Sequence, residues 1–220
     1  MIEVLSQGFD GGKRCLRFEA GGLLQTVYEH PDCPLPLRNI LEGAVAWQKR
    51  NEYKSGTALR TIPQYAAVLL ALGTQVTTGE NREALSDFIE RSGPVGKLTD
   101  IFVPLDVTGR IYGESHVRRT PTDTPIVSAM AGVDIVDGIV KQARLALTGV
   151  WEDNVHLAKA ANLLVGKPLD TQTIADVAAA IQEEVNPKGN YLGSVEYRRA
   201  MAVITIKRAL EICSKGGMLS

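Results

Sequence analysis

The feature that most constrains the fold is an Asp137-Gly138 dipeptide between two β-prone runs. Residues 126–136 and 139–147 are rich in valine, isoleucine, alanine and leucine, and only these two residues separate them. An Asp-Gly pair between such runs is typical of a two-residue hairpin turn in which both central residues have positive φ. The pattern therefore predicts a β-hairpin, and with it an antiparallel sheet in the second half of the chain.

The periodicity of the apolar residues changes in the last third of the chain. Three segments there have the spacing of one helix face, at residues 157–165, 170–185 and 194–213. Asp170 and Ser194 stand where the N-cap residues of the second and third segments belong. We therefore expect three helices, packed as a bundle beside the hairpin sheet.

The first part of the chain has mixed periodicity, interrupted often by glycine and proline. Its expected elements are strands at residues 2–5, 14–18, 74–78, 98–104 and 110–118 and helices at residues 35–48 and 64–72. Asp10-Gly11-Gly12 predicts a hairpin turn between the first two strands, and Pro63 suits a first helical position. The predicted class is therefore α+β, with a mixed region over residues 1–118 and a C-terminal domain of sheet and helices over residues 119–220.

Composition and charge exclude several classes of protein. With 24 Lys plus Arg against 25 Asp plus Glu, the net charge is -1, so the chain lacks the positive field that nucleic-acid binding requires. No apolar run reaches the ~18 residues of a membrane span, and the first residues lack the pattern of a signal peptide. We therefore expect a cytoplasmic protein that binds neither nucleic acid nor membrane.

Few residues have the spacing of a catalytic or metal site. His30, His116 and His156 fit no nucleophile or metal-ligand pattern. Cys15 and Cys33, together with Cys213, form no C-x-x-C pair and indicate reduced thiols. We predict no catalytic residue and no metal ligand.

The strongest binding candidate is the sequence Lys-Ser-Gly-Thr at residues 54–57. Small residues with hydroxyl groups can present N–H and O–H donors to a phosphate, and Arg60 follows closely. Two weaker candidates, residues 93–98 and Gly21-Gly22, are interpreted as a turn and a bend. The basic residues at 117–120 and 196–199 are interpreted as solvated surface charge, with an anion or partner contact as the alternative for the first run.

A longer pattern appears in the C-terminal part. Residues 143–150 read ARLALTGV, residues 166–169 read GKPL, residues 193–202 read GSVEYRRAMA and residues 207–210 read KRAL. In this order and spacing they resemble the C-terminal part of the FAD-binding medium subunits of molybdenum hydroxylases. These are the flavoprotein subunits of the carbon monoxide dehydrogenase and xanthine dehydrogenase group.

The resemblance continues, more loosely, into the first part of the chain. His30-Pro31, Arg50-Asn51 and residues 66–72 resemble positions in the family's second flavin subdomain. Residues 1–118 are therefore expected to be flavin-subdomain-like. Members of the family begin with another small subdomain, whose glycine-rich loop wraps the FAD pyrophosphate, and the resemblance starts after it.

The resemblance implies an FAD-dependent electron-transfer subunit that works with a molybdenum-cofactor large subunit and an iron–sulfur small subunit. Ser55, Gly56, Thr57 and Arg60 are then the candidates for cofactor contact. The family's Gly-Thr-x-Gly-Gly-Asn turn is altered here, since residues 52–58 read EYKSGTA. Two alternatives stay open: a homologue without flavin that serves as a structural or assembly subunit, and a homo-oligomer.

Overall fold

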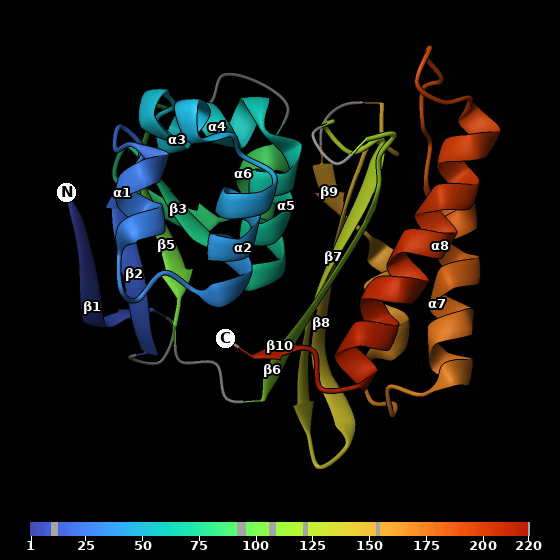
Figure 1. Cartoon of the computed structure of the whole chain (residues 1–220). Helices are drawn as coiled ribbons and strands as arrows, with labels where there is room; N and C mark the ends of the chain where they lie inside the picture. Colours follow the sequence, from blue (N-terminus) through green and yellow to red (C-terminus); the bar gives the residue numbers. More distant parts are fainter. Residues whose placement is uncertain (10–12, 92–95, 106–108, 121–122, 153–154, 220) are drawn as a thin grey trace. The chain divides into compact units, whose positions relative to one another are not determined.

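The computed structural model describes residues 1–9, 13–91, 96–105, 109–120, 123–152 and 155–219. The chain forms two compact units, Met1–Val107 and Thr108–Ser220 (Figure 1). The sequence predicts a boundary at residue 118, but β6 (Arg110–Val117) belongs to the second unit because it pairs along its whole length with β7 (Val127–Val136). Within the described ranges, no helix combines the length and apolar character needed to span a bilayer.

The first unit contains a five-stranded antiparallel sheet in the order β1-β2-β5-β3-β4. Its strands are β1 (Ile2–Phe9), β2 (Lys13–Glu19), β3 (Gln75–Thr78), β4 (Asn81–Ala84) and β5 (Leu98–Pro104). β1 and β2 pair as predicted, with Ile2 opposite Phe18. The predicted turn at residues 10–12 lies outside the described residues. The strands predicted at residues 74–78 and 98–104 are confirmed as β3 and β5.

The helices of the first unit are short. They are α1 (Leu24–Glu29), α2 (Leu35–Gly43), α3 (Trp47–Glu52), α4 (Ser55–Thr61), α5 (Pro63–Leu72) and α6 (Leu85–Glu90). α5 begins at Pro63, is buried from residue 64 to residue 72, and ends at Gly73 with φ 74°. The helix predicted over residues 35–48 is divided into α2 and α3, because Ala46 is extended with φ -55° and ψ 146°.

The second unit has its own five-stranded antiparallel sheet, in the order β10-β6-β7-β8-β9. Its other strands are β8 (Ile139–Thr148), β9 (Val155–Leu157) and β10 (Met218–Leu219). β7 and β8 are joined by Asp137 with φ 52° and Gly138 with φ 74°. Both values are positive, as a two-residue turn of this kind requires, so the predicted hairpin is confirmed.

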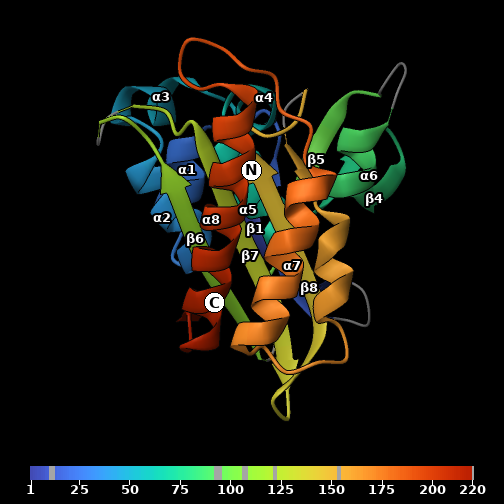
Figure 2. The same ribbon diagram turned by 90° about the vertical axis from the view of Figure 1, so that its right-hand side faces the viewer.

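Two long helices, α7 (Thr171–Glu184) and α8 (Val195–Ser214), lie side by side over one face of this sheet (Figure 2). The side chain of Asp170 accepts a hydrogen bond from the Thr173 amide at 2.8 Å, and that of Ser194 accepts one from the Tyr197 amide at 3.2 Å. Both predicted N-caps are therefore confirmed. They fix where each helix begins.

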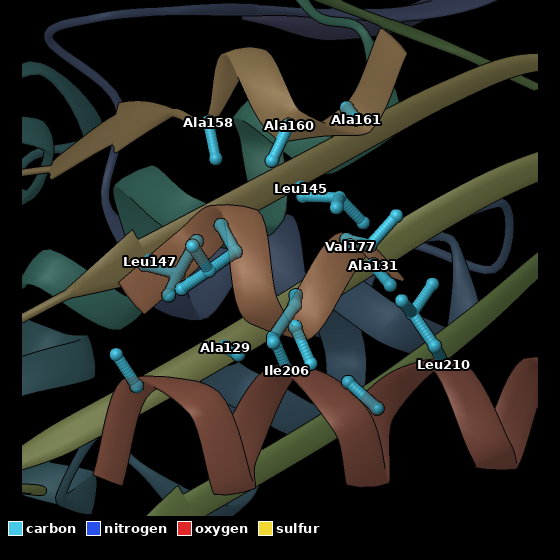
Figure 3. Packing of buried hydrophobic residues seen from close by; sticks show 14 of the residues in the cluster. Ala129, Ala131, Leu145, Leu147, Ala158, Ala160, Ala161, Val177, Ile206 and Leu210 are labelled. Atoms are coloured by element: carbon cyan, nitrogen blue, oxygen red, sulfur yellow. The ribbon is translucent and has the colours of Figure 1, made fainter. Parts of the chain in front are cut away.

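The core of the second unit lies between these helices and the sheet (Figure 3). It includes the buried side chains of Ala129, Ala131, Leu145, Leu147, Val177, Ile206 and Leu210. The α-helix expected at residues 157–165 is instead a 3-10 helix, η1 (Lys159–Leu164), which follows β9 and ends at an extended Val165. Ala160, Ala161 and Leu164 still join the core, so the apolar spacing predicted burial here but not helix type. The α+β class is confirmed, and the three-helix bundle is replaced by two α-helices and a 3-10 helix.

Candidate functional site

The four residues predicted to contact a cofactor belong to α4, three of them in its first turn and Arg60 in its last. Lys54 precedes this helix with extended φ and ψ of -76° and 146°. Ser55 is fully buried and Gly56 is half-buried, whereas Thr57 and Arg60 are exposed. The structure therefore divides the four candidates between the core of the first unit and its surface.

The backbone donors at the start of α4 already have acceptors within the protein. The Ser55 amide donates to the Gly22 carbonyl at 2.8 Å, and the Gly56 amide donates to the Ala20 carbonyl at 2.8 Å. The Ser55 hydroxyl also donates to the Gly22 carbonyl, at 3.2 Å. A phosphate at the start of a helix is held by N–H groups that lack another acceptor. Ser55 and Gly56 therefore do not fit a phosphate group of FAD.

Packing against a neighbouring turn explains the glycine at position 56. A Cβ atom there would lie 3.0 Å from the Cβ of Ala20 and 3.2 Å from its carbonyl oxygen. The turn contains Gly21 and is closed by a hydrogen bond from the Gly22 amide to the Glu19 carbonyl at 2.9 Å. Gly21-Gly22 thus forms a bend, as interpreted from the sequence, and this bend packs against the first turn of α4.

Thr57 and Arg60 are the predicted contacts that stay open to solvent. The Thr57 carbonyl accepts a hydrogen bond from the Thr61 hydroxyl at 2.9 Å, while the Thr57 side chain is exposed. An exposed hydroxyl and guanidinium can meet an anion, but the engaged amides of Ser55 and Gly56 cannot strengthen that contact. This part of the chain offers two surface side chains and no cradle of backbone donors.

A buried hydroxyl lies behind α4. Tyr65 of α5 is fully buried, and its hydroxyl has no hydrogen-bond partner among the described residues. Burial raises the pKa of this phenol. Tyr65 therefore stays neutral and adds no charge to this region.

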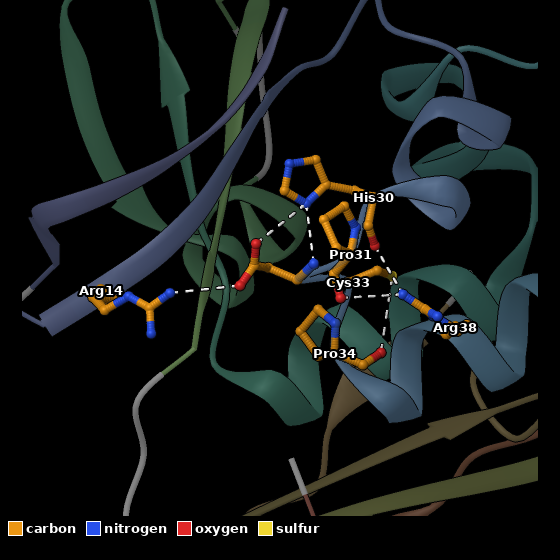
Figure 4. A network of polar contacts seen from close by, with 7 residues as sticks. Arg14, His30, Pro31, Cys33, Pro34 and Arg38 are labelled. Carbon is orange, nitrogen blue, oxygen red and sulfur yellow. Dashed lines mark hydrogen bonds and ion pairs between the residues drawn. The ribbon is translucent and has the colours of Figure 1, made fainter.

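A polar network surrounds His30, between α1 and α2 (Figure 4). The Asp32 amide donates to Nδ1 of His30 at 3.2 Å, and Nη2 of Arg14 lies 3.5 Å from Oδ1 of Asp32. Nη2 of Arg38 donates to the His30 carbonyl at 2.8 Å. These contacts attach the loop to β2 and α2. Nδ1 of His30 accepts a hydrogen bond from the main chain, so the imidazole has a structural role in this loop.

The other two histidines lie elsewhere. Nδ1 of His116 is 3.3 Å from Oε1 of Glu114, and the ring of His156 meets the ring of Trp151 edge-on, with 5.6 Å between centroids. In the part of the chain that the structure describes, no three His, Cys, Asp or Glu side chains gather as metal ligands. Of the candidate phosphate loop at residues 93–98, residues 93–95 lie outside the described ranges.

The three cysteines are free and buried. Burial raises the pKa of Cys33 to about 11 and that of Cys213 to about 12. It also raises the pKa of Cys15. All three therefore stay protonated near neutral pH, so they are poor nucleophiles.

Sequence reasoning missed the role of Arg198, which it interpreted as surface charge. Arg198 is 6% exposed. Its Nη1 donates to the carbonyls of Ile126 and Gly149 at 2.9 and 2.8 Å, and its Nη2 donates to Oδ1 of Asn190 at 2.8 Å. Arg198 thus ties α8 to the ends of β7 and β8. The sequence signal for this contact is the glycine at position 149. Any other residue there would place a Cβ 3.1 Å from Nη1 of Arg198.

The second unit matches a known family in sequence. Residues 113–212 match the model of the CO dehydrogenase flavoprotein C-terminal domain. The carbon monoxide dehydrogenase medium chain of Afipia carboxidovorans is 30% identical over 115 residues, which cover 52% of this chain and 40% of that protein. The glyceraldehyde dehydrogenase medium chain of Sulfolobus acidocaldarius is 26% identical over 117 residues, covering 52% of this chain and 41% of that protein.

Solved structures extend the likeness to the fold of nearly the whole chain. A chain of the reconstituted CO dehydrogenase from Oligotropha carboxidovorans matches 96% of this chain and 77% of its own length, with a TM-score of 0.78 and 22% identity. For quinoline 2-oxidoreductase from Pseudomonas putida 86 the coverages are 99% and 79%, with a TM-score of 0.77 and 21% identity. Residues 113–212 are therefore similar in sequence to the C-terminal domain of CO dehydrogenase flavoproteins, and nearly the whole chain shares the fold of a CO dehydrogenase chain.

Proposed function

We propose that this protein is a medium-chain-type subunit of a molybdenum-hydroxylase-type oxidoreductase. The observation that carries the proposal is the family match over residues 113–212, within a fold that a chain of CO dehydrogenase shares over 96% of this chain. Its partners are a molybdenum-cofactor large subunit and an iron–sulfur small subunit. The substrate is then chosen by the molybdenum subunit.

In the first form of this proposal, the subunit relays electrons from the molybdenum and iron–sulfur centres to an acceptor. FAD supplies that redox chemistry when it is bound. Thr57 and Arg60 are the candidate residues for contact with the cofactor, because both side chains are exposed on α4, Thr57 in its first turn and Arg60 in its last. The amides of Ser55 and Gly56 are engaged, so the donors to the pyrophosphate come from another segment or subunit.

One observation favours a second function, that of a structural or assembly subunit without flavin. The Ala20–Gly22 turn supplies acceptors to both Ser55 and Gly56. A loop that had kept its cofactor would leave these donors free for the ligand. In this second form the protein keeps the fold of the medium chain and supports the assembly of the other subunits.

An absorption spectrum separates the two forms. The purified chain is incubated with FAD and passed through gel filtration, first alone and then together with the two proposed partner subunits. A stoichiometric flavin band near ~450 nm in either sample supports the electron relay. The combined Thr57→Ala and Arg60→Ala variant is then expected to retain less flavin, with Lys49→Ala as a control because Lys49 is another exposed residue of the first unit.

A colourless sample in both settings, with the three subunits still eluting together, supports the structural subunit. If the chain fails to co-elute with either partner when all three are expressed together, the proposal itself is wrong. The elution therefore tests the assignment to a complex, whereas the spectrum tests the cofactor.

A further inference from the structure

One face of the second sheet carries charged side chains that neither form of the proposed function uses. Ala131 and Val133 of β7 point into the core beneath α7 and α8. Side chains alternate along a strand, so Gly132 and Asp134 belong to the opposite face. This opposite face carries the charged side chains.

The strand register places four side chains together on that face. Arg110 of β6 is opposite Asp134, and Gly132 is flanked by Tyr112 of β6 and Arg144 of β8. We call Arg110, Tyr112, Asp134 and Arg144 the arginine cluster. Gly132 lies between Tyr112 and Arg144 in the strand register and has no side chain.

The charges within the arginine cluster do not balance. Arg110 donates to Asp134 through Nε to Oδ1 and through Nη2 to Oδ2 at 2.7 Å. This bidentate pair uses both oxygens of the carboxylate. Arg144 is the second cation of the cluster, and its Nη1 is buried without a hydrogen-bond partner in the described part of the chain.

The surroundings make this arrangement unfavourable for Arg144. Burial lowers the pKa of Arg144 and the positive charge of Arg110 lowers it further, while the carboxylate of Asp134 offsets only part of this shift. Burial raises the pKa of Tyr112 to about 12, so the phenol is neutral and does not supply the missing negative charge. A buried charged group without a protein partner is rare in folded proteins, and such a group commonly binds water, an ion or a ligand.

We propose that the arginine cluster is an anion site, in which Arg144 binds a carboxylate or phosphate group beside Gly132. The guanidinium is a planar donor that suits both kinds of oxyanion. Arg144 as a whole is only half-buried, so solvent reaches part of the residue, and a small anion that binds there would lie beside the buried Nη1. The bound anion would neutralise the charge that Asp134 leaves unpaired.

The test uses inorganic phosphate and acetate as separate probes of the full chain. The dissociation constant of each is measured by calorimetry for the natural protein and for Arg144→Gln. We expect binding of at least one probe, weakened roughly tenfold in the variant because a charged hydrogen-bond donor is lost. Lys141→Gln is the matched control, since it removes the same charge from an exposed position of β8 and should leave binding unchanged.

Arg144→Lys keeps the charge and guards against a fold defect in Arg144→Gln. It should retain part of the binding with an unchanged circular dichroism spectrum. Binding of phosphate alone, or of acetate alone, identifies the class of anion. The proposal is overturned if neither probe binds, or if Arg144→Gln and Lys141→Gln weaken binding equally.

Discussion

The two units are built on similar sheets, but their helices begin in different ways. In the first unit, α1 to α6 are 6 to 10 residues long and each begins without a side-chain cap. In the second unit, α7 and α8 are 14 and 20 residues long and begin at Asp170 and Ser194, whose side chains accept main-chain hydrogen bonds. Helices of fewer than about 12 residues are marginal by themselves. The first unit therefore depends more on tertiary contacts for its helices than the second does.

Each unit also has a buried arginine that donates to main-chain carbonyls. Nη1 of Arg50 donates to the carbonyls of Leu41 and Val45 at 2.7 and 3.0 Å, and its guanidinium lies 4.7 Å from the centre of the Tyr28 ring. Arg50 thus joins neighbouring helices, whereas Arg198 joins segments that are up to 72 residues apart. Trp47 in the first unit and Trp151 in the second provide one fluorescent reporter for each unit.

The largest expected effect is that of Arg198→Met. This change leaves the carbonyls of Ile126 and Gly149 without their donor, which should lower the free energy of unfolding by about 3 kcal/mol or more. Arg50→Met should cost roughly 1 to 2 kcal/mol, because its partners lie within 25 residues of it along the chain and one of them is the apolar ring of Tyr28. Urea unfolding followed by the two tryptophans measures both. An equal loss for the two variants would contradict the contrast between a local and a long-range arginine.

The next effect compares one glycine in each unit. Gly149 has φ 75°, and a Cβ there would lie 2.0 Å from the Ile126 carbonyl oxygen, so Gly149→Ala should cost about 2 kcal/mol or more. Gly56→Ala should cost about 1 kcal/mol, because the Cβ of Ala20 at 3.0 Å requires a smaller shift. Thermal unfolding gives the order of the two variants. The reverse order would mean that α4 is held more rigidly than the end of β8.

A smaller effect is expected from exchanging helix caps. Ser194→Ala should destabilise the second unit by about 1 kcal/mol, since the Tyr197 amide loses its acceptor. Ala46→Ser should stabilise the first unit by about 0.5 kcal/mol, because Ala46 is an exposed, uncapped N-cap residue of α3. Unfolding midpoints of the two variants test this pair. No gain from Ala46→Ser would show that tertiary contacts alone set the start of α3.

The smallest effect concerns pH. The hydrogen bond from the Thr173 amide lowers the pKa of Asp170. A lowered pKa in the folded state stabilises the protein above the ordinary carboxyl value of ~4, and this contribution is lost as the pH falls through the folded pKa. Asp170→Asn keeps an acceptor but does not titrate, so its stability should fall less than that of the natural protein between about pH 5 and about pH 2. If the stability of both proteins falls in parallel with pH, Asp170 does not contribute to the pH dependence.

The features that could be predicted from the sequence are those fixed by neighbouring residues. The Asp137-Gly138 turn and the N-caps at Asp170 and Ser194 involve main-chain groups within a few residues, so local sequence predicts them. The helix expected at residues 157–165 was wrong, because alanine and leucine at helical spacing also satisfy a 3-10 helix that only has to cover the core. The candidate residues Ser55, Gly56, Thr57 and Arg60 remain a prediction as a cofactor site.

The sequence by itself determined the α+β class, the central hairpin of the second unit, the starts of its two long helices and the similarity of residues 113–212 to the CO dehydrogenase flavoprotein C-terminal domain. Only the tertiary structure decided which polar groups are free to act. The Ser55 hydroxyl and amide meet a carbonyl 33 residues away, and Arg198 meets one 72 residues away. The physical reason is that a hydrogen-bond donor can serve a ligand only if the fold leaves it without an internal acceptor, and such long-range pairings leave no local pattern in the sequence.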